Sequence, residues 1–463
     1  MTRTLITGGL VITAAEELHA DVLIENGRVV ALATPGSQQW TADRVIDASH
    51  KYVIPGGIDA HTHMEMPFGG TFASDTFETG TRAAAWGGTT TVVDFAVQSK
   101  GAALRAGLDA WHAKADGNCA IDYGFHMIVA DVNESTLKEM DGLVEEGVSS
   151  FKLFMAYPGV FYSDDGQILR AMQRAGGNGG LIMMHAENGI AIDVLVEQAL
   201  ARGETDPRHH GEVRRALLES EATHRAIKLA QVAGAPLYVV HVSAQEAVAE
   251  LARARDEGLP VFGETCPQYL FLSTDNLAEP DFEGAKYVCS TPLRPKEHQA
   301  ALWRGLRTDD LQVVSTDHCP FCFSGQKEMG RGDFSRIPNG MPGVEHRMDL
   351  LHQAVVDGHI SRRRWIEIAC AAPARMFGLY PRKGTIAPGT DADIVIYDPA
   401  AEQTISAETH HMNVDYSAYE GKRLTGRVET VLSRGEPVIT EREFTGRAGH
   451  GVYTPRGLCQ YLD

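Results

Sequence analysis

The feature that most limits the possible folds is an alternation of short apolar runs and helical segments through the middle of the chain. Eight apolar runs read as buried strands, at residues 53–59, 89–95, 121–129, 149–155, 180–184, 236–242, 260–265 and 311–316. The stretches between them are rich in Ala, Leu, Glu and Arg at helical spacing, for example at 74–86, 134–146, 213–233, 244–257 and 296–307. Eight strand–helix units predict an α/β fold of the (β/α)8 TIM barrel type. An open doubly wound sheet is the alternative, but it would need a phosphate-type glycine loop after an early strand, and the sequence has none.

The two ends of the chain follow a different pattern. Residues 20–32 alternate apolar and polar side chains on both sides of Asn26-Gly27, which predicts a hairpin. Strand patterns return at 384–397 and 427–432. We therefore expect residues 1–51 and 384–463 to form one small β-sandwich domain together, and residues 52–383 to form a catalytic barrel.

Composition excludes several classes of function. The net charge is -19 and no Lys/Arg run is present, which argues against nucleic acids and anionic membrane surfaces as partners. No apolar run approaches the ~20 residues that a membrane span requires, and no signal-peptide core is visible. The seven cysteines are an odd number spread over a long chain, so reduced thiols and a cytoplasmic location are expected. Cys319 and Cys322 form a single CxxC without the second pair of a zinc ribbon.

Candidate metal ligands stand at the ends of the predicted strands, where barrel enzymes carry their chemistry. The first run leads into His61 and His63, whose side chains share one face of an extended chain because alternate residues point the same way. Later runs carry or lead into Lys152, His185, His241 and Asp317. Histidine and carboxylate side chains are common metal ligands, so the sequence predicts a metal site at this end of the barrel.

Lys152 is the unusual member of this group because apolar residues flank it in a predicted buried strand. An unpaired buried ammonium is costly, so the lysine must be neutralised, paired or modified. Carbamylation by carbon dioxide would convert its amine into an anion with two oxygens, one for each of two metal ions. A lysine that reaches solvent from a strand edge is the alternative.

The candidate ligands resemble those of the binuclear-metal amidohydrolases that act on cyclic amides. The likeness extends over nearly the whole chain through further motifs, which are Met66-Pro67-Phe68-Gly69-Gly70, Phe151-Lys152-Leu153-Phe154-Met155-Ala156-Tyr157, His185-Ala186-Glu187-Asn188, Cys289-Ser290-Thr291-Pro292-Leu293-Arg294, Thr316-Asp317-His318-Cys319-Pro320-Phe321 and Pro338-Asn339-Gly340-Met341-Pro342. Together they are similar to the dihydropyrimidinase family, which includes the bacterial D-hydantoinases.

The resemblance implies two divalent metal ions, with zinc expected and with manganese and cobalt also suited to such ligands. The implied ligands of the more buried ion are His61, His63 and Asp317, those of the more exposed ion are His185 and His241, and an N6-carboxylated Lys152 would join both ions. A homotetramer is also implied.

The resemblance further implies roles toward a small cyclic-amide substrate. Tyr157 would face the developing oxyanion, and the backbones at Ser290 and Asn339 would hold the N–H and carbonyl groups of the ring. The expected reaction opens dihydrouracil, dihydrothymine and 5-substituted hydantoins to N-carbamoyl amino acids, as in pyrimidine degradation. A hydroxide that bridges the two ions would attack the ring carbonyl, and Asp317 would act as general base and then as general acid.

Other cyclic-amide hydrolases and a non-catalytic role remain as alternatives. Related dihydroorotases place an arginine just after the first histidine pair, whereas this chain has Met64-Glu65-Met66. We therefore expect an apolar pocket, with candidate walls at Met66, Phe68, Phe154 and Phe161. Allantoinases share the metal ligands. Scaffold homologues have lost ligands, whereas this chain retains all of them.

Overall fold

Eight parallel strands form the barrel that the alternating pattern predicts. In the computed structural model, which describes residues 3–462, they lie in the order β15-β14-β13-β12-β11-β10-β9-β6. Their bounds are β6 (Gly57–Thr62), β9 (Thr89–Val97), β10 (Asp122–Ile128), β11 (Ser150–Phe154), β12 (Leu181–His185), β13 (Leu237–Val239), β14 (Val261–Thr265) and β15 (Val313–Val314). A parallel bridge joins Thr62 to His318, just after β15, so the barrel is nearly closed. The predicted α/β barrel is confirmed.

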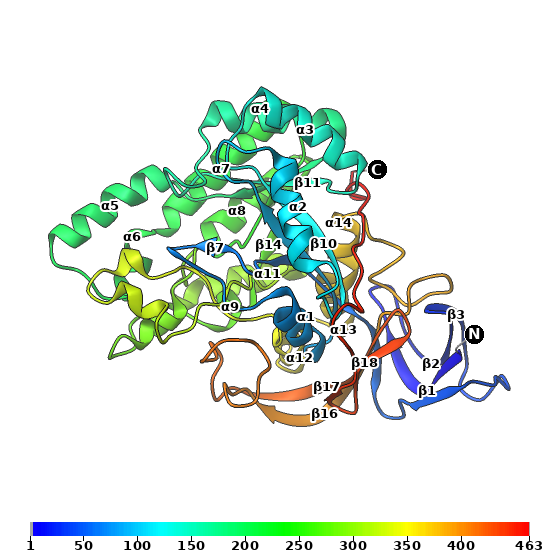
Figure 1. The fold of residues 1–463 in the computed structure, drawn as a ribbon. Helices are drawn as coiled ribbons and strands as arrows, with labels where there is room; N and C mark the ends of the chain where they lie inside the picture. The colour runs from blue at the N-terminus through cyan, green and yellow to red at the C-terminus, as the bar shows by residue number, and fades with distance from the viewer. Residues whose placement is uncertain (1–2, 463) are drawn as a thin grey trace.

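Helices surround the barrel (Figure 1). They are α1 (Phe77–Trp86), α2 (Leu104–Ala115), α3 (Glu134–Glu145), α4 (Asp165–Asn178), α5 (Gly189–Ala201), α6 (Arg208–Val213), α7 (Ala216–Ala233), α8 (Gln245–Asp256), α9 (Pro267–Phe271), α10 (Thr274–Leu277), α11 (Gln299–Thr308), α12 (Arg347–Val356), α13 (Arg362–Ile366) and α14 (Ala372–Met376). Short turns of other helix types are η1 (Glu283–Tyr287), η2 (Lys296–His298), η3 (Lys327–Gly330), η4 (Phe334–Arg336) and η5 (Glu367–Ala371). Capping boxes at Thr76, Asn133 and Asp164 begin α1, α3 and α4.

The helix expected over 213–233 is interrupted at its start. Helix α6 ends at Val213 and α7 begins at Ala216. Between them Arg214 adopts φ -95° and ψ 62°, and its guanidinium turns inward to Glu187, 2.7 Å away. Arg294 donates to the carbonyl of Arg214, so the interruption is held by buried polar contacts that helical periodicity does not encode.

The two ends of the chain build one mainly antiparallel sheet of nine strands (Figure 1). Its order is β19-β18-β17-β16-β5-β1-β2-β3, with β4 beside β1. The bounds are β1 (Arg3–Ile12), β2 (Glu17–Glu25), β3 (Arg28–Ala33), β4 (Arg44–Asp47), β5 (Tyr52–Pro55), β16 (Ile394–Thr404), β17 (Arg423–Ser433), β18 (Glu436–Thr440) and β19 (Glu443–Phe444). A separate hairpin consists of β7 (Pro67–Phe68) and β8 (Thr71–Phe72). Residues from both ends form one apolar cluster, so neither end can bury its apolar face alone.

The run expected as a single strand over 53–59 is two strands. β5 pairs with β1 and β16 in the terminal sheet, whereas β6 begins the barrel. The break falls at Gly56, where a Cβ atom would lie 2.1 Å from Oγ1 of Thr90, so the chain crosses β9 only without a side chain. The division of the chain at residues 51 and 383 stays a prediction, and the pairing of β5 places residues 52–55 with the terminal sheet.

A buried ion-pair network joins the barrel to the terminal sheet. Nζ of Lys383 lies 2.7 Å from Asp122 on β10, 2.5 Å from Asp393 and 3.5 Å from Asp391. Arg434 adds a contact of 3.1 Å to Asp122. The carboxylates of Asp122, Asp391 and Asp393 lie close enough together to hold a cation, and the ammonium of Lys383 occupies that position.

The C-terminal stretch leaves the sheet and runs along the barrel (Figure 1), and near its end the N–H of Gln460 donates to the carbonyl of Arg375 on α14. Tyr453 forms a parallel bridge with Tyr123 of β10, and Ser149 donates to the carbonyl of Gly457 over 2.7 Å. Arg456 donates to the carbonyl of Phe125. These contacts hold the stretch against β10 and the start of β11.

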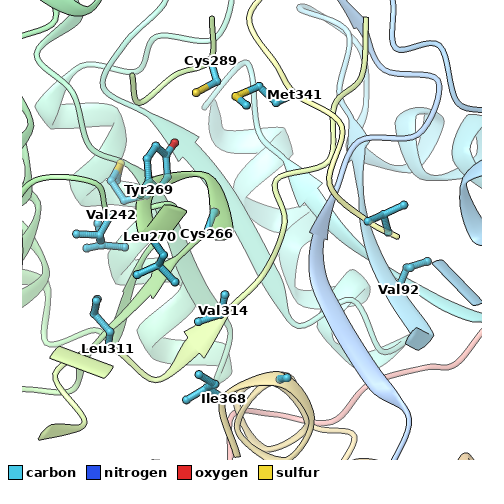
Figure 2. Packing of buried hydrophobic residues seen from close by; sticks show 14 of the residues in the cluster. Val92, Val242, Cys266, Tyr269, Leu270, Cys289, Leu311, Val314, Met341 and Ile368 are labelled. Carbon is cyan, nitrogen blue, oxygen red and sulfur yellow. The ribbon is translucent and has the colours of Figure 1, made fainter. Parts of the chain in front are cut away.

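Apolar packing fixes the strand ends that point toward the site. Figure 2 shows Val314 of β15 above Ile368 of η5, with Leu270, Tyr269 and Cys266 beside them. All five side chains are buried. Close packing of this kind gives the strand ends fixed positions. Within residues 3–462, no helix is both long enough and apolar enough to cross a membrane.

Candidate active site

The six predicted ligands come from five barrel strands or from the residues directly after them. They are His61 on β6, His63 after it, Lys152 on β11, His185 at the end of β12, His241 after β13 and Asp317 after β15. All six are buried. Because the strands run parallel in one barrel, their carboxyl ends lie at the same end of it. The structure therefore brings together the six side chains that their positions at strand ends predict as metal ligands.

His61, His63 and Asp317 form one compact group. Oδ1 of Asp317 lies 3.1 Å from Nε2 of His61 and 3.2 Å from Nε2 of His63. The potential ligand atoms of the three residues all lie within 4.8 Å of one another. Nε2 of His61 is fully buried, and within residues 3–462 its only close polar neighbours are candidate metal-ligand atoms, without hydrogen-bond geometry to any of them. Two imidazole nitrogens and a carboxylate so arranged fit a divalent metal ion.

Glu264 fixes the orientation of His61 from behind. Its Oε1 atom lies 2.6 Å from Nδ1 of His61, and its Oε2 atom accepts a hydrogen bond of 2.9 Å from the hydroxyl of Tyr238. The carboxylate holds a proton on Nδ1, which leaves Nε2 as the ring nitrogen that faces Asp317. Glu264 also accepts from the backbone N–H of His241 over 3.2 Å.

His185 and His241 form a second group. Nδ1 of His185 faces Nε2 of His241, and the other ring nitrogen of His185 lies 2.9 Å from Glu187. Glu187 also accepts from Arg214. Burial lowers the pKa of His185 and lowers that of His241 well below its ordinary value, so both rings are neutral. Two neutral imidazoles whose nitrogens converge suit a second cation.

Lys152 lies between the two groups in an apolar setting. Its Nζ atom is 4.7 Å from the centre of the Phe95 ring and 4.9 Å from that of Phe154. Burial lowers the pKa of Lys152 to about 8. Roughly a tenth of the amine is then uncharged at pH 7, and the uncharged amine is the form that reacts with carbon dioxide.

A pocket of about 420 Å³, including its open mouth, lies above these groups. All four predicted walls line it, namely Met66, Phe68, Phe154 and Phe161. Phe161 stacks on Phe154 with ring centres 5.0 Å apart. The predicted site residues at its surface are His63, Lys152, Tyr157, His185, His241, Ser290, Asp317 and Asn339. Cys319 and Gly340 also contribute, whereas His61 does not line the pocket.

The predicted substrate-binding residues lie on one side of this pocket. Nδ2 of Asn339 donates to Oγ of Ser290 over 3.0 Å. The guanidinium of Arg214 lies 5.6 Å from the centre of the Tyr157 ring. Burial raises the pKa of the Tyr157 hydroxyl, so it keeps its proton and can donate a hydrogen bond.

Sequence reasoning missed the carboxylates that orient the histidines. Glu264 stands near the end of β14, the seventh barrel strand, so its position at a strand end could have marked it as a candidate. It is a single glutamate, however, with no second ligand type at the spacing of a metal-binding motif. Glu187 follows His185 by two residues within the motif His185-Ala186-Glu187-Asn188. The family resemblance assigns this glutamate no role. The i+2 spacing after a candidate ligand was the available signal.

Comparison with known proteins gives concordant matches. The amidohydrolase family matches residues 52–438. A D-hydantoinase of Streptomyces coelicolor is 87% identical over 463 residues, covering 99% of each chain, and one of Geobacillus stearothermophilus is 49% identical, covering 98% of this chain and 96% of that protein. The crystal structure of dihydropyrimidinase from Brevibacillus agri superposes with a TM-score of 0.97 at 51% identity, covering 99% of each chain.

Proposed function

Because this chain belongs to the amidohydrolase family, and within it to the cyclic-amide hydrolases, we propose that it opens the rings of 5-substituted hydantoins and dihydropyrimidines to N-carbamoyl amino acids. The relatives named D-hydantoinase support a preference for the D enantiomer of a 5-substituted hydantoin. Dihydrouracil and dihydrothymine are the proposed dihydropyrimidine substrates, which would place the reaction in pyrimidine degradation.

One observation carries this proposal. The pocket combines the candidate ligands with apolar walls and with the paired polar side chains of Ser290 and Asn339. A 5-substituted hydantoin presents the matching features, a polar N–H and carbonyl edge and, at C5, an apolar substituent. Among residues 3–462 no arginine lines the pocket, which argues against the anionic ring of dihydroorotate.

Two divalent ions, zinc being the proposed metal, are the implied cofactors. His61, His63 and Asp317 would hold one ion, His185 and His241 the other, and an N6-carboxylated Lys152 both. Two observations support this fit: Nε2 of His61 and Nε2 of His63 converge on Oδ1 of Asp317, and the ring nitrogens of His185 and His241 face each other. When bound, such ions lower the pKa of a coordinated water to ~7 and polarise a carbonyl.

The chain's own residues account for substrate binding and proton movement. Ser290 and Asn339 hold the amide edge of the ring, and the Tyr157 hydroxyl donates to the carbonyl oxygen as negative charge develops on it. As the oxygen of a water molecule bonds to the ring carbonyl carbon, Asp317 accepts a proton from that water at the carboxylate oxygen that faces away from His61 and His63. It then delivers this proton to the departing ring nitrogen, which prevents the ring from closing again.

The test is ring opening by purified protein on a 5-substituted hydantoin, dihydrouracil, allantoin and dihydroorotate. Each substrate is assayed with protein as isolated, after chelation, and after restoration of zinc or manganese. Metal-dependent opening of the first two alone is the expected result. A preference for allantoin or dihydroorotate would contradict the argument from the pocket, and inactivity with metal bound would favour a scaffold role.

A homotetramer and a cytoplasmic location complete the proposal. Both rest on the resemblance and on the composition of the chain. Light scattering coupled to size exclusion would measure the oligomer directly, and a mass near that of one 50.3 kDa chain would contradict the tetramer.

A further inference from the structure

Lys327 is a buried lysine whose ammonium is bound by three backbone carbonyls. It is the first residue of η3, its exposed fraction is 0%, and it does not line the pocket. Nζ donates to the carbonyl oxygens of Val288 over 2.9 Å, of Pro338 over 2.7 Å and of Gly340 over 2.7 Å. An ammonium group has three N–H donors, so these three acceptors satisfy it completely.

The three carbonyls belong to two segments that are far apart in sequence. Val288 stands two residues before Ser290, and Pro338 and Gly340 stand on either side of Asn339. The N–H of Gly340 donates to the carbonyl of Val288 over 3.0 Å, so the segments also bond to each other. They meet again at the pocket through Asn339 and Ser290. Lys327 therefore lies beneath the contact that joins the two proposed substrate-binding residues.

We propose that Lys327 is the positioning residue of the substrate-binding loops, which holds the backbones at Ser290 and Asn339 at the spacing that a cyclic amide requires. This inference rests on the proposed function, because it needs those two backbones to contact the ring. It assigns Lys327 no contact with substrate or metal.

A lysine is suited to this place because its long side chain can reach both segments from a third one. Burial lowers the pKa of Lys327 to about 7. The three carbonyl oxygens oppose this effect, because they accept hydrogen bonds from the N–H groups of the charged form. An apolar side chain of similar length would leave three buried carbonyls without this donor. The loops would then move to solvate them, and the spacing of the two backbones would be lost.

The test compares Lys327→Met with a matched variant, Gln98→Leu. Gln98 is also buried and also ties two loops at this end of the barrel, because it accepts from the N–H groups of Ala130 and Asp131 and donates to the carbonyl of Ala102. It does not line the pocket. Both variants lose three hydrogen bonds to loop backbone, but only Lys327→Met loses them in loops that carry substrate-binding groups.

The expected result is a rise in KM of ~10-fold or more in Lys327→Met, as for the loss of one or two hydrogen bonds to the ring. Its kcat stays within ~3-fold of the wild type, because the lost contacts bind the substrate and the transition state equally well. Its metal content is unchanged. Lys327→Arg, which keeps a charged donor, recovers part of the lost affinity. Gln98→Leu lowers Tm but leaves KM unchanged. An unchanged KM in Lys327→Met, or an equal rise in Gln98→Leu, would overturn the proposal.

Hydrogen exchange on the wild-type enzyme tests the same inference without a variant, should Lys327→Met not fold. The amide of Gly340 is expected to exchange slowly without ligand, and the product N-carbamoyl amino acid should add little protection. Protection that arises only with product would overturn the proposal. Absence of ring opening by metal-loaded wild type would instead overturn the proposed function and leave the exchange result standing.

Discussion

The Nδ1 atom of His185 lies 2.9 Å from the Nε2 atom of His241. The two residues follow adjacent parallel strands, β12 and β13, so their side chains leave the barrel next to each other. Glu187 occupies the far nitrogen of His185, which leaves Nδ1 as the atom that faces the pocket. The protein thus selects one nitrogen of this ring before any cation binds.

Replacing Lys152 with alanine should remove the proposed metal bridge. We expect Lys152→Ala to lose most of its metal when measured by atomic emission, and ring opening to fall with it. Short carboxylic acids added at millimolar concentration should restore part of both, because a carboxylate can fill the space of the missing carbamate. Full metal occupancy in the variant would contradict a bridging role.

Replacing Tyr157 with phenylalanine should act on turnover. The loss of one oxyanion donor typically costs ~10²–10³ in kcat. We expect Tyr157→Phe to show a loss of this size with little change in KM or in metal content, in steady-state assays on a hydantoin. If KM alone changed, Tyr157 would serve substrate binding and not the transition state.

Replacing Glu264 with glutamine should weaken metal binding from a distance. The carboxylate fixes His61 at Nδ1, and removal of such a partner typically lowers metal affinity ~10–100-fold. Competition with a chelator of known affinity measures this change. Tyr238→Phe is the control, because it removes a hydroxyl bound to the same carboxylate and leaves the contact with His61. Equal affinities of Glu264→Gln and wild type would contradict the orienting role.

Asp349, on α12, should make stability depend on pH. Burial raises the pKa of Asp349 to about 7, against ~3.9 for an unfolded aspartate. Between these values the folded protein holds a proton that the unfolded chain has released, so this group's contribution to stability falls as pH rises and levels off above pH 7.

Asp349→Asn removes this titration, while its amide oxygen can still accept from Gln403. We expect the Tm of the variant, relative to the wild type, to increase from pH 5 to 7 and then to stay constant. The slope reaches at most ~1.4 kcal/mol per pH unit in unfolding free energy. Tm curves that run parallel across this range would show that Asp349 does not titrate there.

The barrel, and the meeting of the candidate ligands at one end of it, could be predicted from the sequence because both follow local rules. Strand and helix periodicity set the eight units, and the ends of parallel strands must meet, so His61, His185 and Asp317 could be brought together without coordinates. The break at Gly56 could not, because it depends on the approach of Thr90 from another strand.

The orienting and positioning residues were harder to predict for a related reason. Lys327 lies in an irregular segment and bonds to backbone carbonyls, which every residue possesses, so no side-chain pattern marks its partners. Glu264 is a single acidic residue in a strand. Its function depends on its contact with His61, which lies far from it in the sequence.

The pairing of β5 with β16 has a consequence for synthesis on the ribosome. β5 ends at Pro55 and β16 begins at Ile394, so the early strand leaves the exit tunnel long before its neighbour is made. At the usual ~5–20 residues per second the delay is roughly 20–70 s. During this time an apolar strand edge is open to other nascent chains, so faster translation or a chaperone that covers this edge should raise the yield of folded enzyme.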